Sequence, residues 1–229
     1  MIVDTPPYDL VALLACADQL RLLEALVERG QQSGCLRPFR WRLIRDPRRD
    51  QVCQVPEQLL EPFLGSGSCR FLIAWDHSGS GREGQAAEMV EREVRERLKR
   101  RGVPSEEVAA LAFDPELEIC FRPVWRRMVD VLAEVREKEA PDDAVILAAL
   151  TRSGHRAADL DDAFCRFPKE LVEAVFEVLS LRRSPMLYAT LGQKLSISLL
   201  TLGTLGRFSA PLEGWFHPVR SSGDGVRDE

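Results

Sequence analysis

Two unbroken apolar runs predict buried strands of a parallel sheet. Phe71 to Trp75 and Val108 to Phe113 contain only apolar residues, and each run ends at an aspartate, Asp76 or Asp114. Short apolar runs beside turn residues are typical of strands that are covered on both faces, as in a parallel sheet. The chemistry of such a sheet lies at the carboxyl ends of its strands, where both aspartates stand.

The segment between these runs has the pattern of a long surface helix. An apolar stripe and four Glu–Arg pairs at i,i+4 spacing run through residues 83–101, and Gly102 ends the helix. The stripe consists of Ala87, Val90, Val94 and Leu98. Ser80 and Glu83 fit a capping box at the helix start. The strand–helix–strand order then requires a right-handed crossover between parallel strands.

The earlier part of the chain is open to two interpretations. Residues 9–30 fit a single helix that ends at a glycine, and they equally fit a short strand, Leu10 to Ala15, followed by a helix from about Asp18 to Arg29. In the second interpretation Asp18 is the helix N-cap. Periodicity does not separate the two. Pro38 to Arg45 alternates apolar and basic residues, which predicts a half-exposed strand.

After residue 121 the strand pattern gives way to helical periodicity. Helices are predicted over 123–137, 145–150, 168–181, 185–195 and 201–215. We therefore predict a three-layer α/β domain over 1–135, with a mostly parallel sheet of about four strands. A helical region over 136–217 packs on this domain, and residues 218–229 form a disordered tail.

Composition removes several classes of protein. The six cysteines are scattered without a C-x-x-C pair and the three histidines are isolated, which argues against a zinc site with the usual spacing. No apolar run reaches the roughly 20 residues of a membrane span, and the first residues lack the regions of a signal peptide. We expect a cytoplasmic protein with free thiols and no membrane partner. The net charge of −5 gives no general attraction to nucleic acid.

Acidic residues follow three of the possible strands. They are Asp18, Asp76 and the group Asp114, Glu116 and Glu118. Carboxylates that meet at one edge of a sheet repel one another, and a divalent cation offsets that repulsion. The pattern predicts a Mg²⁺ site for phosphoryl or phosphodiester chemistry. Helix capping by Asp18 and solvation of Glu118 are the structural alternatives.

The turn after the first apolar run is a second candidate site. Ser78, Gly79 and Gly81 are small residues before a helix start, which suits an anion cradle, although the turn lacks the G-K-[ST] of a P-loop. His77 is a candidate general base, and simple exposure is the alternative for a histidine in a turn.

Basic side chains gather around the predicted strand at 38–45. The candidates for contact with nucleic-acid phosphates are Arg40, Arg42, Arg45, Arg48 and Arg49. The alternative is a charged strand face that pairs with the many acids of the chain.

Several motifs resemble one family. W-D-H-S-G-S-G-R-E (75–83) followed by F-D-P-E-L-E-I (113–119) resembles the small proteins of methylation-associated phage-defence systems, which are related to TOPRIM-type domains. L-E-G-W-F-H-P (212–218) is similar to the C-terminus of that family. D-L-V-A-L-L-A-C-A-D-Q (9–19) is similar to its first strand and acidic turn, which implies that Leu10 to Ala15 is a strand.

The resemblance also implies roles for the acids. In TOPRIM domains an acid after the first strand and a D-x-D pair after a later strand bind Mg²⁺. Asp18 matches the first acid and Asp76 the first aspartate of the pair, whereas Ser78 occupies the second position and Glu116 or Glu118 would have to substitute.

Two functional hypotheses follow from the resemblance. One is a Mg²⁺-dependent nuclease or nucleotide-processing enzyme of phage defence, in which Asp76, Glu116 and His77 are catalytic. The other is a non-catalytic module that binds other defence proteins within a larger complex.

Overall fold

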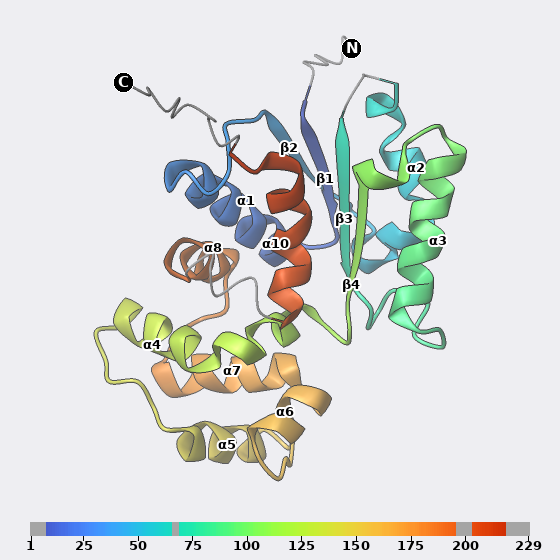
Figure 1. Ribbon diagram of the computed structural model, residues 1–229. Coiled ribbons are helices and arrows are strands. Elements are labelled where there is room, and N and C mark those ends of the chain that lie inside the picture. The colour runs from blue at the N-terminus through green and yellow to red at the C-terminus, as the bar shows by residue number, and fades with distance from the viewer. Residues whose placement is uncertain (1–7, 66–68, 196–202, 219–229) are drawn as a thin grey trace, which may run out of the picture.

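The computed structural model describes residues 8–65, 69–195 and 203–218. Its centre is an all-parallel sheet of four strands in the order β2-β1-β3-β4 (Figure 1). The strands are β1 (Leu10–Leu14), β2 (Trp41–Arg45), β3 (Arg70–Asp76) and β4 (Val108–Phe113). The α/β class and the parallel sheet predicted from the sequence are confirmed.

The strand order reverses between β1 and β3. The chain passes from β1 outward to β2, returns to β3 on the other side of β1, and continues outward to β4. Leu14 stands opposite Arg45 of β2 and Ala74 of β3, so the carboxyl ends of these strands lie level. In open parallel sheets, ligands bind beside such a reversal, at the carboxyl ends of the strands.

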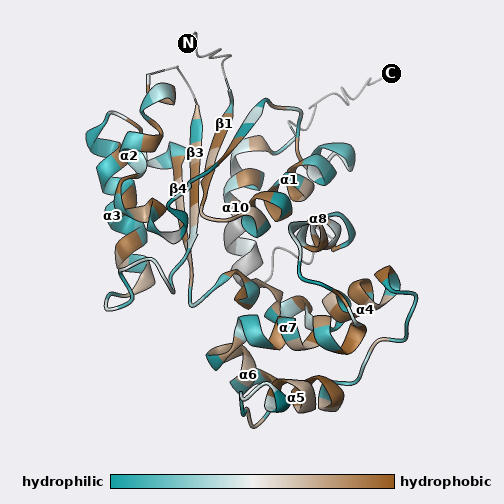
Figure 2. Cartoon of the chain, turned by 180° about the vertical axis from the view of Figure 1, so that it is seen from behind, coloured by the Kyte–Doolittle hydropathy of each residue, from teal (hydrophilic) through white to brown (hydrophobic). Residues whose placement is uncertain are grey.

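Both faces of the sheet are buried, which explains the unbroken apolar runs. Leu10, Ala12 and Leu14 of β1 belong to one core with residues of α1 (Ala17–Gln32), and Val11 and Leu13 belong to a second core with residues of α3 (Ala87–Arg100). Figure 1 shows α1 on one side of the sheet and α3 on the other. The helices are brown on one side and teal on the other in Figure 2, as amphipathic helices on a sheet should be.

The helices that follow the predicted pattern with shifted ends are α4 (Trp125–Val135), α5 (Asp143–Arg152), α7 (Pro168–Leu179), α8 (Pro185–Lys194) and α10 (Gly203–Phe216). A short helix, α2 (Pro56–Leu59), precedes β3, and α6 (Leu160–Arg166) forms where no helix was predicted. Turns of 3₁₀ helix occupy Arg49–Gln54, Glu61–Phe63, Ser105–Glu107 and Leu117–Val124. Helices α4 to α7 lie together beyond the carboxyl ends of the strands (Figure 1).

Helix α10 runs back along the sheet. The backbone N–H of Arg37 donates to the carbonyl of Phe216 at 2.8 Å, and the Trp215 indole donates to the carbonyl of Glu106 just before β4. Phe216 also stacks on Phe39, with ring centroids 3.7 Å apart. The end of the helical region is thereby tied to the amino ends of β2 and β4. The rest of the predicted tail, 219–229, lies outside the described residues.

Two predicted helix starts are wrong. Helix α1 begins after Cys16, which is the N-cap and accepts from the N–H of Gln19, so Asp18 lies in the first turn instead. Helix α3 begins at Ala87 without a side-chain cap. The Ser80 hydroxyl donates to the His77 carbonyl and does not cap a helix, because a tight turn follows β3.

Within the described ranges, no helix combines the length and the apolar character that crossing a membrane requires.

Candidate functional site

A cleft of about 520 Å³ lies at the carboxyl edge of the sheet, beside the reversal of strand order. Its walls come from the residues after β1 and β2, from the end of β3, and from the helical region. The lining residues are Ala15, Cys16, Ala17, Asp18, Arg45, Asp46, Pro47, Arg49, Asp76, Lys169 and Arg183. Segments far apart in the sequence therefore meet in one polar cleft.

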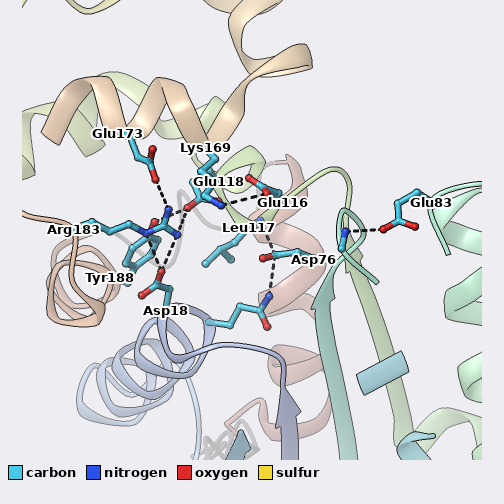
Figure 3. Close-up of polar contacts among 12 residues, drawn as sticks. Asp18, Asp76, Glu83, Glu116, Leu117, Glu118, Lys169, Glu173, Arg183 and Tyr188 are labelled. Atoms are coloured by element: carbon cyan, nitrogen blue, oxygen red, sulfur yellow. Dashed lines mark hydrogen bonds and ion pairs between the residues drawn. The ribbon is translucent and has the colours of Figure 1, made fainter. Parts of the chain in front are cut away.

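Asp76 ends β3 at the cleft and is held by neutral donors. Its Oδ1 accepts hydrogen bonds from Gln19 Nε2 and from the backbone N–H of Leu117, each at 2.9 Å (Figure 3). Gln19 is fully buried, and its Oε1 accepts from the N–H of Ala15 at 3.1 Å. Asp76 thus joins β3 to α1 and to the 3₁₀ turn after β4.

The start of α1 lies on the same cleft. Ala17 and Asp18 form its first turn, so the positive end of the helix dipole is close to the cleft. Burial, and then the charge of Asp76, raises the pKa of the Cys16 thiol to about 12. Cys16 is therefore a protonated capping thiol at neutral pH and not a nucleophile.

Arg183 lies at the centre of a group of three carboxylates. Its guanidinium lies 2.9 Å from Asp18, 3.0 Å from Glu118 and 2.8 Å from Glu173 (Figure 3). Glu118 is only 2% exposed and also accepts from the Tyr188 hydroxyl at 2.6 Å. These contacts connect α1, the turn after β4, and both helices that flank Arg183.

The surroundings shift the pKa values of this group. Burial opposes the charge of Arg183, but the negative groups around the guanidinium outweigh it and raise the pKa of Arg183. Burial and the nearby charge of Glu118 raise the pKa of Tyr188, so its hydroxyl stays a donor. Burial also raises the pKa of Glu116, against the attraction of Lys169 at 3.7 Å.

The acids predicted to bind Mg²⁺ are therefore held by groups of the chain itself. Asp18 and Glu118 share Arg183, and Glu116 pairs with Lys169. Among the residues that the structure describes, no three His, Cys, Asp or Glu side chains form a group that could hold a metal ion. As arranged, Asp18, Asp76, Glu116 and Glu118 do not fit a preformed Mg²⁺ site, and Mg²⁺ binding stays a prediction from the sequence.

The turn after β3 is filled by its own carboxylate. Gly79 and Gly81, both at positive φ, donate their N–H groups to Glu83 Oε1 at 2.8 and 3.2 Å. Hydrogen bonds from its own N–H and from those of Gly81 and Gly79 lower the pKa of Glu83. The N–H of Ser78 donates to the Pro115 carbonyl at 2.9 Å. An external anion would have to displace Glu83 from this cradle.

His77 lies outside the cleft lining. It is 5% exposed, and its Nε2 lies 2.9 Å from the carbonyl of Gln85, which makes Nε2 the protonated nitrogen. A histidine in this place fixes the turn to the segment before α3. Its role as a general base remains a prediction from the sequence.

The predicted arginine patch is divided by the fold. Arg45 and Arg49 line the cleft. Arg48 contacts Asp46, with its N–H at 2.9 Å and its Nε at 3.4 Å from Oδ1. Arg40 and Arg42 are exposed and lie outside the cleft lining. Two of the five candidates therefore share a site with Asp76.

Sequence reasoning missed three residues of this site. Lys169 and Arg183 come from the helical region, and no local pattern distinguishes them from other surface cations. Asp46 carried a usable signal, because it follows β2 as Asp76 ends β3.

No protein-family model, curated protein or solved structure matches the chain.

Proposed function

We propose that this chain binds a phosphorylated ligand, either a nucleotide or the phosphorylated end of a nucleic acid, in the cleft between β1 and β3. The observation that carries the proposal is the gathering of Arg45, Arg49, Lys169 and Arg183 around a cleft at the reversal of strand order. Parallel sheets bind ligands at this point, and arginine pairs well with phosphate in two-point contacts.

The basic groups differ in what they offer a ligand. Arg183 is committed to three carboxylates and therefore orients the cleft wall. Arg45 and Arg49 are exposed at the cleft. Lys169 lies 3.7 Å from Glu116, a long contact that leaves its ammonium able to turn toward a phosphate. The first turn of α1, which contains the cleft residues Ala17 and Asp18, offers backbone N–H groups as further donors.

The motif resemblance bears on the ligand class and on the partners that we propose. Similarity to the small TOPRIM-related proteins of phage defence favours a nucleotide or nucleic acid over other phosphate esters, and favours other defence proteins as partners. We propose binding rather than cleavage, because Glu116 does not line the cleft and Ser78 stands where TOPRIM domains have the second aspartate of the pair.

Calorimetric titration with ATP and with a 5′-phosphorylated single-stranded oligonucleotide tests the proposal. We expect the Arg45→Ala/Arg49→Ala double variant to bind either ligand roughly tenfold or more weakly, because charge-assisted hydrogen bonds to phosphate are lost. The matched control is Arg40→Ala/Arg42→Ala, which removes the same charge outside the cleft. The proposal is wrong if the wild type binds neither ligand, or if both double variants weaken ATP binding equally.

The same control variant separates nucleotide from nucleic acid. If a strand follows the whole patch, Arg40→Ala/Arg42→Ala weakens oligonucleotide binding and leaves ATP binding unchanged. It also flattens the salt dependence, by about 0.7 in the logarithmic slope for each phosphate that the variant no longer neutralises.

The second candidate function is a non-catalytic module of a larger defence complex. It is favoured by the Arg183 contacts, in which acids serve to hold the helical region on the sheet. This candidate predicts that the Arg45→Ala/Arg49→Ala variant still co-purifies with the product of a neighbouring gene. Failure of the wild type to co-purify with any such product would remove it.

A further inference from the structure

Asp46 is a buried acid at the wall of the cleft. It directly follows β2, and its N–H donates to the carbonyl of Leu14 at 2.9 Å. The N–H of Arg49 closes a turn through Pro47 by donating to the Asp46 carbonyl at 3.1 Å. The Asp46 side chain has 0% exposure although it is adjacent to exposed arginines.

The two carboxylate oxygens of Asp46 have different surroundings. Oδ1 accepts from the N–H of Arg48 at 2.9 Å and contacts its Nε at 3.4 Å. Oδ2 is buried and has no hydrogen-bond partner among the described residues. Buried carboxylate oxygens are almost always paired with donors, so Oδ2 needs a donor that these residues do not supply.

We infer that Asp46 accepts a hydrogen bond from a ligand hydroxyl, so that the cleft takes a ribonucleotide with its ribose at the end of β2. This inference rests on the proposed function and identifies its ligand class. In a doubly wound sheet the start of the first helix holds phosphate, and an acid further along the chain accepts from the ribose hydroxyls. Here α1 begins at the cleft and Asp46 follows the next strand.

Electrostatics support a hydroxyl at this position. A phosphate beside Oδ2 would be repelled, whereas a hydroxyl is a neutral donor that a carboxylate binds well. Asp46 belongs to no group of three candidate metal ligands within the described residues. Arg45 and Arg49 remain at the same wall for the charged part of the ligand.

Access to Oδ2 requires a side chain to turn. The oxygen is closed to solvent, so a hydroxyl reaches it only after a covering group moves. The Arg48 side chain is 42% exposed, and its Nε contact with Asp46 is long, so we expect this arginine to rotate away when the ligand enters.

Calorimetric titration with ATP, GTP, their 2′,3′-dideoxy analogues and pyrophosphate tests the inference on the wild type. We expect the better ribonucleotide to bind roughly tenfold tighter than its dideoxy analogue, since a hydrogen bond to a charged group is lost. Asp46→Asn keeps the oxygen that accepts from Arg48 and places an amide at the other position. In this variant we expect the difference between ribonucleotide and dideoxy analogue to vanish, while pyrophosphate binds at least as tightly as to the wild type, because a negative charge is removed from the cleft wall.

The matched control is Asp114→Asn. Asp114 is another aspartate that follows a strand and precedes a proline, but it is exposed and outside the cleft lining. Equal binding of ribonucleotide and dideoxy analogue to the wild type overturns the inference and leaves the proposed function standing. Absence of binding for every probe, pyrophosphate included, overturns both. If a thermal melt shows that Asp46→Asn does not fold, the wild-type comparison alone decides.

Discussion

Two turns at the carboxyl edge of the same sheet differ in how well they satisfy the carboxylate that each contains. After β3, the amides of Gly79 and Gly81 bind the carboxylate of Glu83, and the turn is closed. After β2, Asp46 has one oxygen held by Arg48 and the other without a donor among the described residues, and the turn faces the cleft. The turn that looked like an anion site in the sequence is the one that the chain fills itself.

The comparison indicates that the position of a turn along the sheet edge matters more for forming a binding site than its glycine content. Helices α1 and α3 lie on opposite faces of the sheet (Figure 1). The cleft lies at the carboxyl ends of β1 and β3, the strands that precede these helices. The turn from 77 to 83 is hydrogen-bonded to the end of β4 and to the residues after it, through His77 and Ser78, and none of its residues lines the cleft. Glycine-rich sequence alone does not create a binding site.

The largest expected effect on stability comes from loss of the contacts between Arg183 and the carboxylates around it. Arg183→Met should lower the free energy of unfolding by about 3 kcal/mol, because Glu118 would stay buried without its cation. Urea unfolding measures the loss. The Arg183→Met/Glu118→Gln double variant should recover much of it, since a neutral amide needs no counter-charge. A loss below about 1 kcal/mol in the single variant would mean that these contacts do not hold the cleft wall.

The next effect tests the acid at the end of β3. Asp76→Ala should lower the free energy of unfolding by about 1–3 kcal/mol, because Gln19 and the N–H of Leu117 lose their acceptor. Asp76→Asn retains an oxygen in that place and should cost less. Thermal unfolding of the two variants checks this. Equal losses would show that the charge, rather than the acceptor oxygen, supports the cleft.

A smaller effect concerns the closed turn and depends on pH. The folded chain lowers the pKa of Glu83, so the charged carboxylate stabilises the fold above the pKa of an unfolded glutamate and this contribution is lost as pH falls. Between about pH 5 and pH 3, the melting temperature of the wild type should fall more steeply than that of Glu83→Gln. Parallel curves would show that the turn does not depend on the Glu83 charge.

The smallest effect separates the cleft thiol from the surface thiols. Cys16 lines the cleft but has a pKa of about 12, so almost no thiolate forms at about pH 8. Iodoacetamide should label the exposed Cys35 and Cys165 and leave Cys16 unmodified, as measured by peptide mass spectrometry. Labelling of Cys16 at the rate of the exposed thiols would contradict the burial of this cleft wall.

The sheet could be predicted because burial on both faces leaves a local mark. The runs that became β3 and β4 are apolar throughout, and the stripe of α3 is buried as its spacing indicated. The apolar pattern left the start of the chain undecided, and the family resemblance indicated the strand that became β1.

Local patterns failed where tertiary contacts compete with them. Ser80 and Glu83 match a capping box, but the glycines between and before them adopt positive φ and bring Glu83 back onto the turn. Of the spaced Glu–Arg pairs on α3, Glu91 and Arg95 lie 3.9 Å apart, while Glu93 pairs with Arg82. Ion pairs at the surface are weak enough for neighbours to redirect them.

The candidate site was predicted in part. Asp18, Asp76, Arg45 and Arg49 were identified because strand ends and charge runs are visible in the sequence, and they share the cleft. Asp46 could have been found by the same rule for strand ends. Lys169 and Arg183 could not, since only the packing of the helical region on the sheet brings them there.

Because Lys169 and Arg183 belong to the helical region, the complete cleft requires that region as well as the sheet. A fragment that ends with β4 would have the reversal of strand order but only the β1, β2 and β3 walls of the cleft. Exchange of the helical region between related genes would replace one wall while leaving the sheet intact. Ligand preference in such a lineage would then change by recombination downstream of the sheet, without any substitution in the strands.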